Sequence, residues 1–173
     1  MKLLFLINPH AGKAEIKNKA LEIIDLFIQN GYEVTVHTTQ APMEIPQILK
    51  RTGKKYDLIV TCGGDGTLNE TVEGLLRLKD YAPPLGYIPA GTVNDFASSL
   101  GISKNMTEAA KDTLNGKLFL CDIGIFEKRF FTYIAAFGAF TDVSYQTPQE
   151  FKNLLGRAAY ILEGIRRLPS IQS

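Results

Sequence analysis

The chain has 173 residues, of which 45% are hydrophobic and 21% charged, and its formal net charge is +1. This length and composition predict a globular protein of one domain, or of one domain and part of another, that buries a core. Because the charges nearly balance, no field of the whole chain would attract nucleic acid, and no nucleic-acid partner is expected.

The cysteines and the amino terminus indicate the compartment. Cys62 and Cys121 each lie in an apolar run without metal-ligand spacing, so both are expected to be free buried thiols in a reducing cytosol. The apolar run Leu3–Ile7 is too short for a signal peptide, and no segment reaches the length of a transmembrane span. The sequence therefore predicts a cytoplasmic protein.

Predicted strands and helices alternate from residue 1 to residue 114. The predicted strands are Leu3–Ile7, Tyr32–Thr38, Asp57–Cys62 and Leu85–Ile88. Apolar residues recur at helical spacing after each strand, and a further helix is predicted over Met106–Leu114, with Asn105 and Glu108 as its capping box. This order predicts an α/β fold, a parallel sheet with helices on both faces. Right-handed crossovers would bring the loops after the strands to one edge of the sheet.

The third predicted strand runs into the segment Cys62–Glu70, which contains three glycines and Asp65. Ligands of α/β sheets bind at such strand ends, glycines permit close approach, and the amides of a helix start attract anions. Asp65 would repel a bare phosphate, so its expected partner is a metal ion, a ribose hydroxyl or a backbone amide. A structural turn is the alternative for the loop, and a capping box is the alternative for Thr67 and Glu70.

Two further loops follow predicted strands. In the first, Asn8–Lys13, the lysine would either pair with phosphate or remain solvated. The second, Gly91–Asp95, again combines a glycine with a hydroxyl, although capping of the next helix explains Asn94 and Asp95 as well. Neither a P-loop nor a Rossmann dinucleotide pattern occurs in the sequence.

After Gly116 the pattern changes to long β-type runs. Leu118–Phe126 and Phe130–Phe140 are joined by a hairpin signal, and a helix is predicted to begin near Thr147. Asp122 lies inside the first run, where a buried carboxylate needs a cation or hydrogen-bond donors, so it is expected to be a site residue, with a structural ion pair as the alternative. We predict an α/β domain over residues 1–122 and the beginning of an incomplete, β-rich second lobe over residues 123–173.

Three motifs in this order resemble the diacylglycerol kinase catalytic family, and more narrowly its soluble bacterial lipid kinases. They are Asn8-Pro-x-Ala-Gly-Lys13, Gly63-Gly-Asp-Gly-Thr-Leu-Asn-Glu70 and Pro89-Ala-Gly-Thr-Val-Asn-Asp-Phe-Ala97, and the resemblance extends over about residues 1–168. NAD kinases and 6-phosphofructokinases share the glycine loop and an amino-terminal lobe of this kind, but they lack the first and third motifs.

The resemblance implies an ATP-dependent kinase that uses Mg²⁺ to phosphorylate the hydroxyl of diacylglycerol or a related lipid. It implies that Asp65, Asp95 and Asp122 are catalytic and that Asp65 reaches the metal through water. The residues implied to hold the nucleotide are Asn8, Pro9, His10, Ala11, Gly12, Thr39, Gly63, Gly64, Asp65, Gly66, Thr67, Leu68, Asn69, Gly91 and Thr92. Because the substrate is a lipid, transient contact with a membrane surface is also implied.

The chain ends before the second lobe of such kinases is complete. The general base, a glutamate in this family, is therefore expected outside this chain, and an apolar patch left by the missing lobe predicts self-association into a homo-oligomer. Three alternatives to an active lipid kinase stay open: an enzyme like NAD kinase, a nucleotide-binding module without turnover, and a fragment that binds no nucleotide.

Overall fold

The computed structural model describes residues 1–78, 81–126 and 129–132. The chain divides into two compact units, Met1–Tyr133 and Ile134–Ser173, and all described residues lie in the first. The helix predicted near Thr147 and most of the run Phe130–Phe140 fall outside the described residues. The domain boundary predicted at residue 122 stays a prediction.

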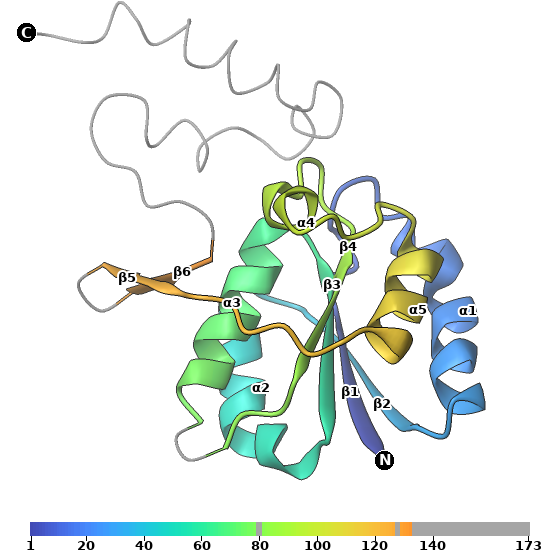
Figure 1. Cartoon of the computed structure of the whole chain (residues 1–173), viewed down its shortest axis with the longest axis horizontal. Coiled ribbons are helices and arrows are strands. Elements are labelled where there is room, and N and C mark those ends of the chain that lie inside the picture. Colours follow the sequence, from blue (N-terminus) through green and yellow to red (C-terminus); the bar gives the residue numbers. More distant parts are fainter. Residues whose placement is uncertain (79–80, 127–128, 133–173) are drawn as a thin grey trace, which may run out of the picture. The chain divides into compact units, whose positions relative to one another are not determined.

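Four parallel strands form a sheet in the first unit. They are β1 (Lys2–Ile7), β2 (Glu33–Thr38), β3 (Leu58–Gly63) and β4 (Leu85–Pro89), in the order β2-β1-β3-β4 (Figure 1). β1 pairs with β2 on one side and with β3 on the other, and the last residue of β3 pairs with the last residue of β4. Because all four strands are parallel, their carboxyl ends meet at one edge of the sheet, as predicted.

Alternate residues of β1 face two helical layers. Leu3, Phe5 and Ile7 pack with α1 (Ile16–Gln29) and α5 (Met106–Asn115), whereas Leu4 and Leu6 pack with α2 (Glu44–Thr52) and α3 (Asp65–Leu76). The short 3₁₀ turn η1 (Gly53–Lys55) follows α2. A strand covered on both faces is apolar throughout, which explains the unbroken run at the start of the sequence. The predicted α/β fold with helices on both faces is confirmed (Figure 1).

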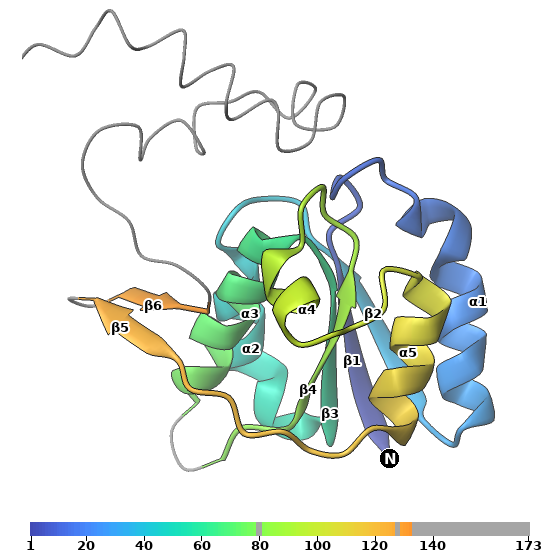
Figure 2. The same cartoon turned by 45° about the horizontal axis from the view of Figure 1, so that its top comes forward.

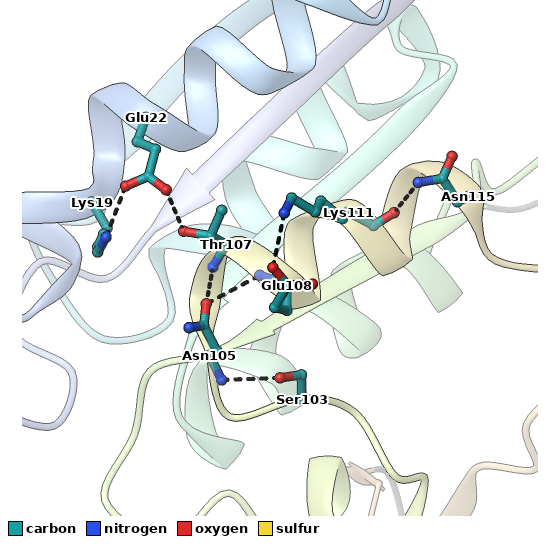
Figure 3. A network of polar contacts seen from close by, with 8 residues as sticks. All are labelled: Lys19, Glu22, Ser103, Asn105, Thr107, Glu108, Lys111 and Asn115. Atoms are coloured by element: carbon teal, nitrogen blue, oxygen red, sulfur yellow. Dashed lines mark hydrogen bonds and ion pairs between the residues drawn. The ribbon is translucent and has the colours of Figure 1, made fainter.

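Polar contacts fix α5 at its amino end and join it to α1 (Figure 3). Asn105 Oδ1 accepts hydrogen bonds from the amides of Thr107 and Glu108, at 3.0 and 3.1 Å. Thr107 Oγ1 donates to Glu22 Oε1 of α1 at 2.8 Å. Of the predicted capping box, the hydrogen bonds to the Asn105 side chain form. The Glu108 side chain pairs with Lys111 instead of returning to the Asn105 amide. The cap nevertheless begins the helix at the predicted residue.

One alternative is excluded and one predicted boundary is wrong. The helix after the glycine loop, α3, begins at Asp65, so Thr67 and Glu70 do not form the capping box that was the alternative for them. Of the predicted strand over residues 118–126, only β5 (Gly124–Phe126) forms, paired antiparallel with β6 (Arg129–Phe131). The predicted hairpin is confirmed, but its first strand is short because no described strand pairs with residues 118–123.

The two cysteines differ in exposure. Cys62 is buried in β3 and Cys121 is exposed, and both are free, so the prediction of burial is wrong for Cys121. Its segment does not enter the sheet, which leaves the neighbouring Leu118, Phe119 and Leu120 exposed as well. In the described part of the chain, no helix combines the length and apolar composition needed to cross a bilayer.

Candidate functional site

Three loops meet at the carboxyl edge of the sheet: the Asn8 loop (residues 8–15), the Gly64 loop (residues 63–66) and the Gly91 loop (residues 90–94) (Figure 2). The Asn8 amide donates to the Cys62 carbonyl at 2.9 Å, and its side-chain Nδ2 donates to Thr67 Oγ1 at 3.1 Å. The Ala90 amide donates to the Gly63 carbonyl at 2.8 Å. The three motifs of the sequence therefore come together in space.

Glycines allow the loops to touch through their backbones. Gly12 has φ 52°, and a Cβ at this position would lie 2.4 Å from the Ala90 carbonyl oxygen. A Cβ on Gly91 would lie 2.5 Å from Gly64 Cα. No side chain fits at either contact, so these glycines are required by the approach of one loop to another.

The Asp65 carboxylate binds the start of α4 (Asp95–Ser99). Its two oxygens accept hydrogen bonds from the amides of Asp95 and Phe96, each at 3.2 Å. Asn94, at the N-cap position, has φ 56° and makes no side-chain cap, so Asp65 supplies the cap from the start of α3. Of the three partners expected for Asp65, the backbone amide is the one observed.

The Asn94 side chain makes hydrogen bonds to both backbone groups of Gly91. Its Oδ1 accepts from the Gly91 amide at 2.9 Å, and its Nδ2 donates to the Gly91 carbonyl at 2.8 Å. The alternative that Asn94 caps the next helix with its side chain is therefore excluded. Beneath these hydrogen bonds lies Tyr87 of β4, whose hydroxyl donates to the Gly63 carbonyl at 3.2 Å. Sequence reasoning missed Tyr87, although a buried tyrosine hydroxyl needs a partner and that need was a usable signal.

The loop after β2 carries Thr39 and is attached to α3. The Thr39 amide donates to the Ile7 carbonyl at 2.8 Å, which places the residue at the end of β1. Burial raises the pKa of Glu70 of α3, and interaction with the backbone of Met43 and Ile45, at the start of α2, opposes the rise. Glu70 therefore interacts with a neighbouring helix start, and not with the start of its own helix as the capping-box alternative would require.

Glu44 orders the same loop from within. Its carboxylate accepts the Gln40 amide at 2.6 Å and lies 3.1 Å from His37 Nε2. The hydrogen bond from the Gln40 amide is the main cause of the lowered pKa of Glu44, and the contact with His37 adds to it. The backbone after β2 is thus held by two carboxylates, Glu44 and Glu70, from two helices.

One predicted site residue, Asp122, lies differently from the expectation, and two residues of the Asn8 loop are exposed. Asp122 is exposed, so the prediction of a buried carboxylate is wrong, because the segment around it is not a covered strand. His10 and Lys13 are also exposed, and Lys13 precedes the first residue of α1 by three positions. The catalytic and nucleotide-binding roles of all these residues stay predictions.

The described residues contain no group of three or more histidine, cysteine, aspartate or glutamate side chains that could hold a metal ion. A protein-only metal cage is therefore absent from this part of the chain. Mg²⁺ at phosphate sites needs less, because it keeps several waters and binds one or two carboxylates together with substrate phosphates. Asp65, with its carboxylate at the start of α4, fits that smaller requirement.

Comparison with known proteins agrees with the motifs. Residues 2–125 match the model of the diacylglycerol kinase catalytic domain. The chain is 39% identical over 167 residues to a diacylglycerol kinase of Bacillus subtilis, covering 95% of this chain and 55% of that protein. It is 35% identical over 170 residues to a diacylglycerol kinase of Staphylococcus aureus, covering 96% of this chain and 53% of that protein.

A crystal structure of a diacylglycerol kinase from Bacillus anthracis matches with a TM-score of 0.67 and 30% identity. The match covers 75% of this chain and 47% of that one. The chain thus spans about half the length of the relatives it matches. Because the family model covers most of the residues and the loops that carry the motifs form one site, the chain belongs to the diacylglycerol kinase catalytic domain family.

Proposed function

We propose that this chain supplies the nucleotide-binding lobe of an ATP-dependent lipid kinase that phosphorylates the hydroxyl of diacylglycerol or a related lipid. The observation that carries the proposal is the mutual contact of the Asn8, Gly64 and Gly91 loops at the carboxyl edge of the sheet. Ligands of open α/β sheets bind outside this edge. Family membership and the names of the relatives supply the substrate class.

The site suits phosphoryl transfer, in which catalysis is mostly positioning and electrostatic stabilisation. The first amides of α3 follow directly after Gly64 and would face phosphate oxygens, with the positive end of the helix dipole behind them. The residues proposed to hold ATP are the run from Asn8 to Gly12, Thr39, the run from Gly63 to Asn69, Gly91 and Thr92.

Mg²⁺, when bound with the nucleotide, would neutralise charge on the phosphates. Asp65 is proposed to reach the ion through water, since a carboxylate has about four lone-pair sites and the two amides at α4 use two of them. Asp95 and Asp122 are proposed as further acidic members. The general base is proposed to lie outside this chain. We further propose a cytoplasmic protein that contacts membrane surfaces transiently and associates with itself.

The proposal is tested by calorimetry of ATP with Mg²⁺ on this chain and on two variants with the same change of charge. Asn8→Asp places a carboxylate in the proposed phosphate loop, where the Thr67 hydroxyl can still bind it. It should weaken ATP binding about tenfold or more, because the new charge repels phosphate at short range. Asn18→Asp, at an exposed position of α1, should bind ATP as the unchanged chain does.

Equal ATP affinity in both variants would contradict the proposed phosphate site. The reaction itself is tested on the whole kinase of which this chain is the proposed lobe, with radiolabelled ATP, diacylglycerol in mixed micelles and NAD as a competing acceptor. Transfer to NAD and to no lipid would contradict a lipid kinase. ATP binding without transfer to either acceptor would support the alternative of a nucleotide-binding module without turnover.

A further inference from the structure

Tyr87 is a buried titratable residue to which the proposed reaction assigns no role. It lies in β4, two residues before the strand ends, and only 6% of it is exposed. Its ring packs in a cluster with Leu68 and Val72 of α3, and it lies 6.5 Å from the Phe96 ring of α4, centroid to centroid. Burial raises the pKa of Tyr87, with the Asp65 charge adding to the rise, so the hydroxyl remains a hydrogen-bond donor at neutral pH.

The hydroxyl connects the strand end of one glycine loop to the other glycine loop. It donates to the Gly63 carbonyl at 3.2 Å, the same oxygen that accepts the Ala90 amide at 2.8 Å. It also lies 3.5 Å from Asn94 Oδ1, which accepts the Gly91 amide at 2.9 Å. The single hydroxyl proton can be shared between these two acceptors, and a path of polar contacts therefore connects Gly63 through Tyr87 and Asn94 to Gly91.

This path lies beside the closest approach of the two loops. A Cβ on Gly91 would lie 2.5 Å from Gly64 Cα, and a Cβ on Gly64 would lie 3.2 Å from Gly91 Cα. Backbones in such contact cannot move independently, so a shift of the Gly63 carbonyl changes the place of the Gly91 amide. The group that fixes that carbonyl therefore also sets the spacing of the loops.

We propose that Tyr87 is a positioning residue whose hydroxyl holds the Gly64 and Gly91 loops at the spacing at which they bind the phosphates of a nucleotide. This inference rests on the proposed function. Tyr87 acts through the loop backbones and touches no ligand. A purely structural tyrosine would contribute to stability alone and would leave the ligand affinity of the folded protein unchanged.

The first test uses the nucleotide-free chain. Tyr87→Phe removes one hydroxyl and keeps the ring, and Tyr81→Phe makes the same change at an exposed position. Exchange of the Gly91 amide, followed by NMR, should become about fivefold faster in Tyr87→Phe, as expected for the loss of one hydrogen bond. The Gly31 amide, which bonds to Ile28 at the end of α1, should exchange at an unchanged rate. Tyr81→Phe should change neither rate.

The second test measures the Kd of ATP with Mg²⁺ well below the melting temperature of every variant. Tyr87→Phe should raise the Kd about fivefold, whereas Tyr81→Phe should leave it unchanged. Asn94→Gly tests the path, because glycine accepts the φ of 56° and removes the side chain that brackets Gly91. The double variant should bind about as the weaker single variant does, because both changes break one connection.

Each outcome decides a different point. An unchanged Gly91 exchange rate in Tyr87→Phe would overturn the inference, and so would a faster rate with an unchanged Kd. Losses of affinity that multiply in the double variant would overturn the path through Asn94. Absence of ATP binding by the unchanged chain would overturn the proposed function, and the inference with it. Only this last outcome involves the unchanged chain, so the two failures are distinguishable.

Discussion

Gly12 has a left-handed backbone conformation, with φ 52°. The Ala90 carbonyl oxygen lies so close that a Cβ on Gly12 would clash with it. Gly31 offers a matched comparison, since it has φ 83° and no atom within 4 Å of an added Cβ. Gly12 is required both by its backbone conformation and by the lack of space for a side chain. Gly31 is required only by its backbone conformation. The difference between them isolates the contact of the Asn8 loop with the Gly91 loop.

We therefore expect Gly12→Ala to destabilise the protein more than Gly31→Ala. Both substitutions incur the left-handed penalty of about 1–2 kcal/mol. Overpacking against Ala90 should add about 1–3 kcal/mol for Gly12→Ala alone. Urea denaturation of both variants measures the two free energies of unfolding. Equal losses would mean that the two loops do not touch.

Asp65 marks the limit of prediction at the residue scale. Its charge and its place in a phosphate-type loop restricted its partners to a metal ion, a ribose hydroxyl or a backbone amide. The choice among them depends on α4, whose first amides lie beside the carboxylate although they are thirty residues away in the chain. Local sequence contains no sign of that approach, since Asn94 and Asp95 are themselves common capping residues.

At the scale of elements, Glu70 joins α3 to α2. The backbone of Met43 and Ile45, at the start of α2, lowers the pKa of Glu70 against the rise caused by burial. Met43 has φ 61°, an uncommon conformation for a residue with a side chain, so Glu70 interacts with a strained part of the backbone. Glu70 therefore links α3 to the loop that carries Thr39 and precedes α2.

The pH dependence of stability should reveal this link. The pKa of Glu70 is raised above 4.5 in the folded protein, so above that pH the folded state binds the proton more tightly than the unfolded state, and stability falls as pH rises. Glu70→Gln removes this loss. Its free energy of unfolding relative to the unchanged chain should therefore rise as the pH increases above 4.5. Urea denaturation across this range measures it.

Glu33→Gln, at an exposed position of β2, provides the control with the same change of charge. Its free energy of unfolding relative to the unchanged chain should show no such rise with pH. A parallel dependence in the two variants would contradict the raised pKa of the half-buried Glu70.

Most helices and strands were predictable because the sequence patterns that indicate them are local. The apolar run of β1, the helical stripe of α1 and the Asn105 cap of α5 need no distant partner to be recognised. The main failure involves distant partners. Residues 118–123 have strand-like composition but no described strand to pair with.

At the scale of the molecule, the two cysteines report on different parts of the first unit. Cys62 lies in β3 with no exposed surface, and burial raises its pKa to about 12. Cys121 is exposed. Thiol reagents act on the accessible thiolate, so Cys62 should react only after the sheet opens.

In native protein at pH 8 we expect one thiol to react rapidly and the second only in urea. In a Cys121→Ser variant, the slow reaction of Cys62 then measures opening of the sheet. ATP with Mg²⁺ at 100 times its Kd should slow that reaction about 100-fold, because a ligand that binds only the folded state lowers the open population by this factor. Rapid labelling of both thiols would contradict the buried position of Cys62.

The place of β1 in the sheet also has a consequence for how the chain folds during synthesis. β1 is made first, yet it lies between β2 and β3, and Leu6 pairs with both His37 and Thr61. Three strands and their helices are therefore complete while the partners of Gly12 and Asp65, at Ala90 and Asp95, are still unmade. Until β4 arrives, β3 has an unpaired edge that is open to other chains. The site is the last part of the sheet to assemble, and its completion coincides with the closing of that edge.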